Sequence, residues 1–116
     1  MPPLLKKKCK PCEDSDISPM SHEDAEKLME QLSGWLLSTD AKKITKTLLF
    51  SDFMDSLTFV NSVASLAELE GHHPDIWISY NKVTLQLTTY SIQGLTENDF
   101  ILATKIDEML KKQNIF

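Results

Sequence analysis

Hydrophobic residues recur along this chain with two different periods, and the period changes at recognisable stop signals. Ser21 is a good N-cap, with Asp24 three residues on, and predicts a first helix that ends at Gly34. A second helix is expected from Ser51 or Asp52 to Glu70, with Gly71 as its left-handed stop. The stretch 96–99 has the form of a capping box and predicts a last helix. The expected buried stripes of the three helices are Ala25, Leu28, Met29 and Leu32; Phe53, Leu57, Val60, Ala64 and Ala67; and Leu102, Ala103, Ile106, Met109 and Leu110.

Four other segments predict strands, and two of them, residues 43–50 and 83–89, alternate with a period of two, which is typical of half-buried strands. Residues 35–37 and 43–50 predict one hairpin, and residues 76–80 and 83–89 predict a second hairpin around Asn81-Lys82. The residues expected to face inward are Ile44, Leu48 and Phe50 in the first hairpin and Val83, Leu85 and Leu87 in the second, whereas Thr84, Gln86 and Thr88 are expected to face outward.

The order of these elements is αββαββα, which predicts an α+β fold. Strands joined mainly by hairpins form antiparallel sheets, and long amphipathic helices must cover such a sheet to bury their apolar stripes. We therefore expect a four-stranded antiparallel sheet with its helices on one face. Residues 1–20 hold four of the five prolines and no sustained periodicity, so we expect a mobile N-terminal leader and a single domain over residues 21–116.

Composition and charge narrow the classes of function. A chain of 116 residues fits one domain, and its 41% hydrophobic and 25% charged residues are ordinary for a soluble globular protein. Its net charge of −5 argues against direct nucleic-acid binding, which needs clustered Lys and Arg. No apolar run approaches the length of a membrane span, and the start lacks a signal-peptide core. We expect a cytoplasmic protein without a membrane partner, with the nucleus as a second compartment.

The two cysteines, Cys9 and Cys12, form a Cys-Lys-Pro-Cys stretch. Such spacing occurs in redox motifs and in halves of zinc sites. The stretch lies between a basic and an acidic run, with no second ligand pair elsewhere in the sequence. We therefore interpret both residues as cysteines of the leader.

The histidine pair His72-His73 is the most unusual feature of the sequence, because it comes directly after a helix stop and precedes a proline. Histidine titrates near pH ~6.5, so one imidazole of a pair can act as an acid while the other acts as a base. Two other interpretations stay open. The pair could cap the helix dipole, or could bind a metal with Glu68, Asp75 or His22, although adjacent histidines rarely aim at one ion.

The spacing Glu68-x3-His72-His73-Pro74-x5-Tyr80-x9-Tyr90-x8-Asp99 closely resembles the signature of the pterin-4a-carbinolamine dehydratase family. The stretches Tyr80-Asn81-Lys82-Val83 and Gly94-Leu95-Thr96 add to the resemblance, which runs from about Gly34 to Ile106. The resemblance implies helices on one side of a four-stranded antiparallel sheet, and assembly into homodimers or homotetramers.

The resemblance also implies an activity: a hydro-lyase that removes water from a 4a-hydroxytetrahydropterin in tetrahydrobiopterin recycling, with no cofactor and no metal. The implied catalytic residues are His72, His73, Tyr90 and Asp99. The residues implied to bind the reduced pterin are Glu68, His72, His73, Thr88, Thr89, Tyr90 and Ser91. Asp99 also has a structural interpretation, as the last residue of the helix-capping box.

The chain differs from the family pattern at two positions. Tyr90 stands where the motif normally has a third histidine, and Gly71 stands where many relatives carry an acidic residue. A phenol with a pKa of ~10 donates a hydrogen bond well but accepts a proton poorly at neutral pH. Animal members of the family also act as dimerisation partners of a transcription factor through a helix face. The alternative functions are therefore pterin binding without turnover and a protein-dimerisation role.

Overall fold

The computed structural model describes residues 4–7, 9 and 18–113. In chain order, its elements are η1 Leu4–Lys6, α1 His22–Met29, β1 Leu36–Leu37, β2 Ile44–Leu49, α2 Phe53–Glu70, β3 Asp75–Ser79, β4 Lys82–Leu87, η2 Tyr90–Ile92 and α3 Glu97–Gln113. The predicted order αββαββα is confirmed for the α-helices and strands. Two short 3-10 helices, η1 and η2, add to it.

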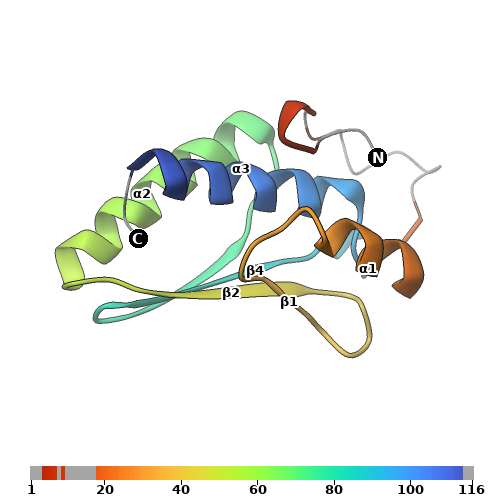
Figure 1. The fold of residues 1–116 in the computed structure, drawn as a ribbon, viewed down its shortest axis with the longest axis horizontal. Coiled ribbons are helices and arrows are strands. Elements are labelled where there is room, and N and C mark those ends of the chain that lie inside the picture. The colour runs from red at the N-terminus through yellow and green to blue at the C-terminus, as the bar shows by residue number, and fades with distance from the viewer. Residues whose placement is uncertain (1–3, 8, 10–17, 114–116) are drawn as a thin grey trace.

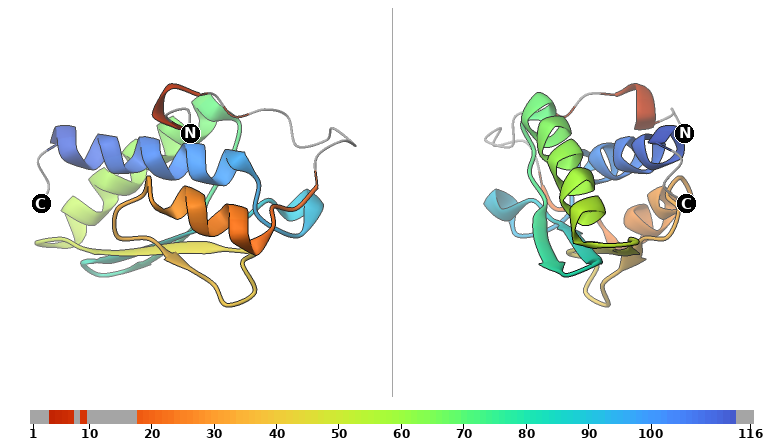
Figure 2. Two further views of the ribbon diagram at one scale, coloured as in Figure 1. Left: turned by 45° about the vertical axis from the view of Figure 1, so that its right-hand side comes forward. Right: turned by 90° about the vertical axis from the view of Figure 1, so that its left-hand side faces the viewer.

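The four strands form one antiparallel sheet in the order β1-β2-β4-β3. All three α-helices lie on the same side of this sheet (Figure 1), and the end-on view in Figure 2 shows α2 and α3 next to each other above the strands. The predicted α+β fold, with helices on one face of an antiparallel sheet, is confirmed. The central strands β2 and β4 come from different hairpins, so their pairing joins the two halves of the chain.

The core lies between the sheet and the helices. The predicted inward residues of β4, Val83, Leu85 and Leu87, are completely buried, and Ile44 and Leu48 are buried beside them on β2. The α3 residues that close the core from above are Phe100, Ile101, Leu102, Ala103, Ile106 and Leu110. The alternation predicted for β2 and β4 is therefore confirmed, and it directs one face of the sheet to the helices.

Helix α1 begins as predicted and ends earlier than predicted. The Ser21 hydroxyl accepts a hydrogen bond from the Asp24 backbone N–H at 3.1 Å, which confirms the N-cap. The helix ends at Met29 and not at Gly34, because the next three backbone N–H groups bond to carbonyls three residues back. Such bonds tighten a last turn and end the α-helical run. Gly34 instead lies in the link to β1.

Helix α2 has the predicted caps but a different buried face. The Asp52 carboxylate caps its start, and Gly71 ends it in the left-handed conformation at φ 67°. The predicted stripe is confirmed at Ala67, which is buried, and Val60 packs partly against the core. It is wrong at Phe53, which is 44% exposed, and at Ala64, which is exposed. The residues that α2 buries are Ser56, Phe59, Val63 and Ala67. Apolar residues lie on more than one side of this helix, so its periodicity does not select one face.

The described part of the N-terminal segment packs on the domain. Leu4 in η1 is 1% exposed and belongs to the core, and Lys7 forms an ion pair of 2.7 Å with Glu97 at the start of α3. The sequence pattern gave no sign of these contacts, because Leu4 and Leu5 are too few to show a period. The boundary of the domain at residue 21 stays a prediction. No helix in the described ranges is both long and apolar enough to cross a membrane.

Candidate active site

The two adjacent histidines lie in opposite environments. Because Gly71 takes the left-handed conformation, the chain turns sharply after α2, and the His72 backbone N–H bonds back to the Ala67 carbonyl at 3.2 Å. This turn directs the His72 side chain inward, where the residue is 7% exposed, and leaves the His73 side chain 60% exposed. The pair therefore offers one buried imidazole and one in contact with solvent.

His72 is held by a completely buried carboxylate. Its Nε2 lies 2.6 Å from Oδ1 of Asp99 on α3. The other oxygen of Asp99, Oδ2, accepts hydrogen bonds from the Thr89 hydroxyl at 2.9 Å and the Thr96 backbone N–H at 3.0 Å. A carboxylate only accepts hydrogen bonds, so the ring Nε2 donates and fixes the tautomer of His72. The second ring nitrogen, Nδ1, is then the one that can exchange a proton with a ligand.

Asp99 combines the two roles that the sequence left open. Its bond to the Thr96 N–H is half of the predicted capping box at the start of α3. The Thr96 hydroxyl does not complete the box; it lies 2.9 Å from the Thr89 hydroxyl. Since Thr89 donates to Asp99, Thr96 donates to Thr89, and the chain of bonds runs from Thr96 through Thr89 to the carboxylate. The cap thus fixes the carboxylate that orients His72.

His73 pairs with a different carboxylate, on the surface. Its Nε2 lies 2.8 Å from Glu68 Oε2, with the Glu68 side chain 78% exposed. Exposed pairs of this kind contribute about 0–1 kcal/mol and are screened by salt. Glu68 therefore orients His73 without fixing it, and the imidazole stays accessible to a ligand.

Tyr90 begins η2 and is 66% exposed. Its phenol O–H donates to Oδ2 of Asp75, the first residue of β3. This hydrogen bond, with smaller effects of burial and of the Asp75 charge, raises the pKa of Tyr90 above its ordinary value. Tyr90 is therefore a neutral donor at physiological pH. The sequence pattern suggested Asp75 only as a metal ligand and not as the partner of Tyr90, because nothing in its spacing indicates a contact across two loops.

Two of the predicted binding residues take other positions. The Thr88 hydroxyl donates to the Lys42 carbonyl at 2.6 Å, so Thr88 is buried, and the prediction that it faces outward is wrong. The strand ends at Leu87, and beyond that point the alternation no longer applies. Ser91 is exposed within η2. The structure thus joins His72, Thr89 and Asp99 directly, while Thr88 shapes the loop that carries Tyr90.

The described residues contain no cluster of three or more His, Cys, Asp or Glu side chains that could hold a metal ion. His22, one of the alternative ligands, pairs with Glu26 at 2.8 Å on α1. Burial and the nearby Glu70 carboxylate raise the pKa of the Cys9 thiol to about 12, which keeps it protonated and unreactive. Cys12, the other half of the predicted cysteine pair, lies outside the described residues.

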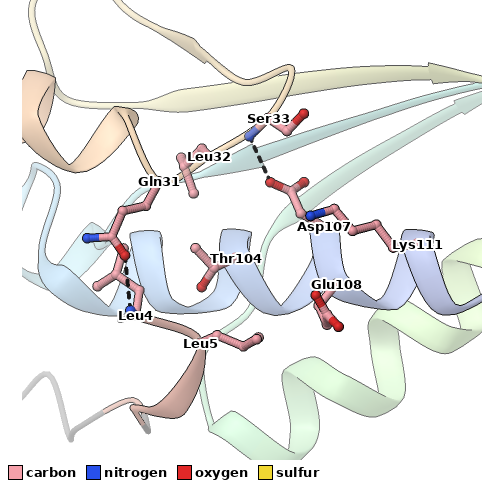
Figure 3. Close-up of a pocket in the computed structure, with 9 residues that line it drawn as sticks. All are labelled: Leu4, Leu5, Gln31, Leu32, Ser33, Thr104, Asp107, Glu108 and Lys111. Atoms are coloured by element: carbon pink, nitrogen blue, oxygen red, sulfur yellow. Dashed lines mark hydrogen bonds between the residues drawn. The ribbon is translucent and has the colours of Figure 1, made fainter. Parts of the chain in front are cut away.

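A cavity of about 360 Å³ lies away from the histidines, between η1, the end of α1 and α3 (Figure 3). Asp107 of α3 points into it and accepts a hydrogen bond from the Ser33 N–H at 3.0 Å, while the Leu4 N–H donates to the Gln31 side chain at 3.1 Å. Asp107 also accepts from Trp35 and Lys46. These polar groups bind each other, so the cavity has the character of a structural junction.

Residues 18–109 match the family model described as pterin 4 alpha carbinolamine dehydratase. A Halorhodospira halophila protein, provisionally named a pterin-4-alpha-carbinolamine dehydratase, is 43% identical over 91% of this chain and 96% of its own length. The mitochondrial pterin-4-alpha-carbinolamine dehydratase 2 of Arabidopsis thaliana is 41% identical over 91% of this chain; the match spans 58% of that longer protein.

Solved structures agree with these similarities. The crystal structure of a transcriptional coactivator/pterin dehydratase from Brucella melitensis superposes with a TM-score of 0.74 at 29% identity, covering 79% of this chain and 98% of that one. A pterin dehydratase-like protein described as a RuBisCO assembly factor in the alpha-carboxysome gives a TM-score of 0.57 at 20% identity, over 68% of this chain and 92% of its own. At that identity, the second structure supports the fold alone.

Proposed function

The chain belongs to the pterin-4a-carbinolamine dehydratase family, and from this premise we propose that it is a hydro-lyase acting on a 4a-hydroxytetrahydropterin. In this proposal it produces the quinonoid dihydropterin and water, within the recycling of tetrahydrobiopterin. The observation that carries the proposal is the pair of adjacent imidazoles, one fixed by a buried carboxylate and one accessible. We propose no cofactor and no metal for the reaction.

The chemistry needs one acid and one base. The bond between C4a and its hydroxyl oxygen breaks, the oxygen leaves as water with a proton from the acid, and a ring nitrogen gives its proton to the base. His72, through Nδ1, and His73 supply these two functions, and each returns to its starting state by proton exchange with water. Asp99 holds His72 in one tautomer, and the buried carboxylate stabilises positive charge that develops as the hydroxyl leaves.

We propose that the pterin lies across the His72-His73 turn, between η2 and the start of α3. Tyr90 then offers its phenol as a hydrogen-bond donor or stacks on the flat ring, in the place where the family pattern has histidine. Glu68 and Ser91 are proposed to bind the polar edge of the ring, while the buried Thr89, whose hydroxyl donates to Asp99, supports the site through that carboxylate. Thr88 can contribute only its backbone, because its hydroxyl donates to the Lys42 carbonyl.

The test is the rate of disappearance of 4a-hydroxytetrahydropterin with the purified protein between about pH 6 and pH 9, beside a Tyr90→His variant. Catalysis above the uncatalysed rate supports the proposal, and a faster Tyr90→His variant would show that the phenol limits the reaction. Tight pterin binding with no turnover in either protein would instead establish a binding role.

Helix α2 carries a specific observation in favour of a protein partner. Three residues of the stripe expected in the core, Phe53, Leu57 and Ala64, are not buried, and Val60 is only partly buried against the core. Met54 is 67% and Leu69 84% exposed. We propose that this helix face joins copies of the chain as a dimer or tetramer, or binds a protein partner. A Met54→Glu variant should lower the molar mass measured by light scattering; an unchanged mass would refute assembly through this face.

The compartment also stays a proposal. The sequence predicts the cytoplasm, with the nucleus as a second compartment, whereas the Arabidopsis relative is named as mitochondrial. Imaging of the tagged full chain in its own cells distinguishes these locations.

A further inference from the structure

A second buried carboxylate lies beside the proposed site and takes no part in the chemistry above. Glu70, the last residue of α2, places Oε2 at 2.7 Å from Lys105 Nζ on α3. Its other oxygen, Oε1, accepts a hydrogen bond of 3.0 Å from the Cys9 backbone N–H. The side chains of Glu70 and Lys105 are only 9% and 16% exposed. Three separate parts of the chain therefore meet at one carboxylate.

The charge of Glu70 is maintained despite its burial. Burial by itself raises the pKa of this carboxyl, but the hydrogen bonds and charge of Lys105 and the Cys9 N–H outweigh it, so the pKa lies below its ordinary value. Glu70 is consequently ionised at neutral pH, and the pair with Lys105 is a complete ion pair. If the two groups of a buried ion pair separate, each is left as an uncompensated charge, which is costly. The pair therefore holds the two helices at the separation that keeps both charges in contact.

This ion pair lies close to the catalytic residues along both helices. Only Gly71 separates Glu70 from His72, while Lys105 lies almost two helical turns beyond Asp99 on α3. The end of α2 is thus attached to α3 at two points, Glu70 to Lys105 and His72 to Asp99. Two attachments fix both the separation and the relative rotation of the helix ends, whereas one attachment leaves the turn at Gly71 free to pivot.

The N-terminal segment strengthens the first attachment. Lys7 pairs with Glu97 on the first turn of α3, and the Cys9 thiol lies 3.5 Å from the Asn98 carbonyl. The Cys9 N–H then reaches Glu70, a residue of α2. Lys7 and Cys9 therefore contact both helices beside the ends that hold His72 and Asp99.

We propose that Glu70 is a positioning residue of the active site: by attaching the end of α2 to Lys105 and to the N-terminal segment, it sets the geometry at which His72 meets Asp99. This inference rests on the function proposed above. It assigns no contact with the pterin to Glu70, and it predicts that loss of the attachment slows the chemical step more than it weakens substrate binding.

The molecule supplies a matched control. Lys46 and Asp107 form a second ion pair of 2.8 Å, with side chains 11% and 9% exposed. Asp107 lies two residues after Lys105, so the pair is on another side of α3. Its length and burial are similar to those of the Glu70 pair, but it does not adjoin the histidine turn. Asp107 accepts hydrogen bonds from three donors and Glu70 from two, so replacement of Asp107 should cost at least as much stability, and only replacement of Glu70 should affect His72.

The experiment compares Glu70→Gln with Asp107→Asn in the full chain, at a temperature where both remain folded by circular dichroism. Turnover of 4a-hydroxytetrahydropterin gives kcat and KM, and ¹⁵N NMR of the His72 ring reports on its bond to Asp99. We expect Glu70→Gln to lower kcat by about 10-fold with KM changed much less, and to shift the His72 ring resonances. We expect Asp107→Asn to leave kcat within about two-fold and the resonances in place.

Equal effects of the two variants, or no effect of Glu70→Gln on kcat and on the His72 ring, would overturn the inference. If Glu70→Gln does not fold, the Glu70→Gln/Lys105→Met double variant, which removes both charges, takes its place with the same expectations. If the wild-type protein shows no turnover, the proposed function fails, and the His72 ring resonances alone test the inference about Glu70. A shift of these resonances in Glu70→Gln but not in Asp107→Asn supports the inference. The absence of a shift in Glu70→Gln overturns it.

Discussion

Replacement of Asp99 separates its structural role from its chemical role, because two substitutions remove different sets of its hydrogen bonds. Asp99→Ala deprives three buried groups of their acceptor: the His72 ring, the Thr89 hydroxyl and the Thr96 N–H. Truncation of one partner in a buried charged network costs about 3–5 kcal/mol. Since whole domains are stable by about 5–15 kcal/mol, Asp99→Ala should be strongly destabilised.

Asp99→Asn has a smaller expected effect on stability and a large one on turnover. The amide oxygen can keep both bonds made by Oδ2, to Thr89 and Thr96, but the amide N–H₂ then faces His72 Nε2. The ring must adopt the other tautomer to accept this bond, and it loses charge assistance, which we expect to cost about 1–2 kcal/mol. Its Nδ1 then carries the proton, so neutral His72 no longer offers a lone pair there, and kcat should fall by about 100-fold.

Urea unfolding followed by circular dichroism gives both stabilities, and the pterin assay gives kcat. An Asp99→Asn variant with the kcat of the wild type would refute the assigned tautomer. Equal destabilisation by Asn and Ala would refute the hydrogen-bond pattern around Asp99.

Three further predictions concern other parts of the fold. Phe59 of α2 is completely buried, and its replacement by Ala should lower the free energy of unfolding by about 3–5 kcal/mol. A decrease below about 1 kcal/mol in urea unfolding would contradict its place in the core. Asp75→Asn should lower the pKa of Tyr90 toward its ordinary value, as read from phenolate absorbance in a Tyr80→Phe background; an unchanged titration would show that the hydrogen bond does not form in solution. Folding lowers the pKa of Glu70, so this residue stabilises the folded state fully above its ordinary pKa of 4.5, and the stabilisation is lost as pH falls through the pKa of the folded state. The difference in unfolding free energy between the wild type and Glu70→Gln should therefore shrink in acid. A difference independent of pH would contradict the lowered pKa.

The fold could be predicted from the sequence where local chemistry decides the structure. Ser21 and Asp52 are N-caps, Gly71 is a left-handed stop, and the alternation over 83–87 directs one face of β4 inward. Each of these depends on a few neighbouring residues. The buried face of α2 could not be predicted in this way, because apolar residues lie on several of its sides and tertiary packing makes the choice.

The candidate site could be predicted only in part, since its contacts join residues distant in sequence. The spacing around His72-His73 and Asp99 predicted these residues as candidates, but it did not indicate that His72 is buried against Asp99 while His73 is exposed. That difference depends on where the turn at Gly71 meets the start of α3. The ion pair of Glu70 with Lys105 has no local signal either, because each residue alone resembles an ordinary charged residue of an amphipathic helix.

The most direct test of the account is turnover by a variant in which both His72 and His73 are replaced by Ala. The remaining histidine, His22, lies on α1 and is paired with Glu26, so His22→Ala is the control. The account predicts that the double variant folds, binds pterin more weakly and has no turnover above the uncatalysed rate, while His22→Ala keeps full activity. Dehydration at the wild-type rate by the double variant would contradict the central role of the histidine pair.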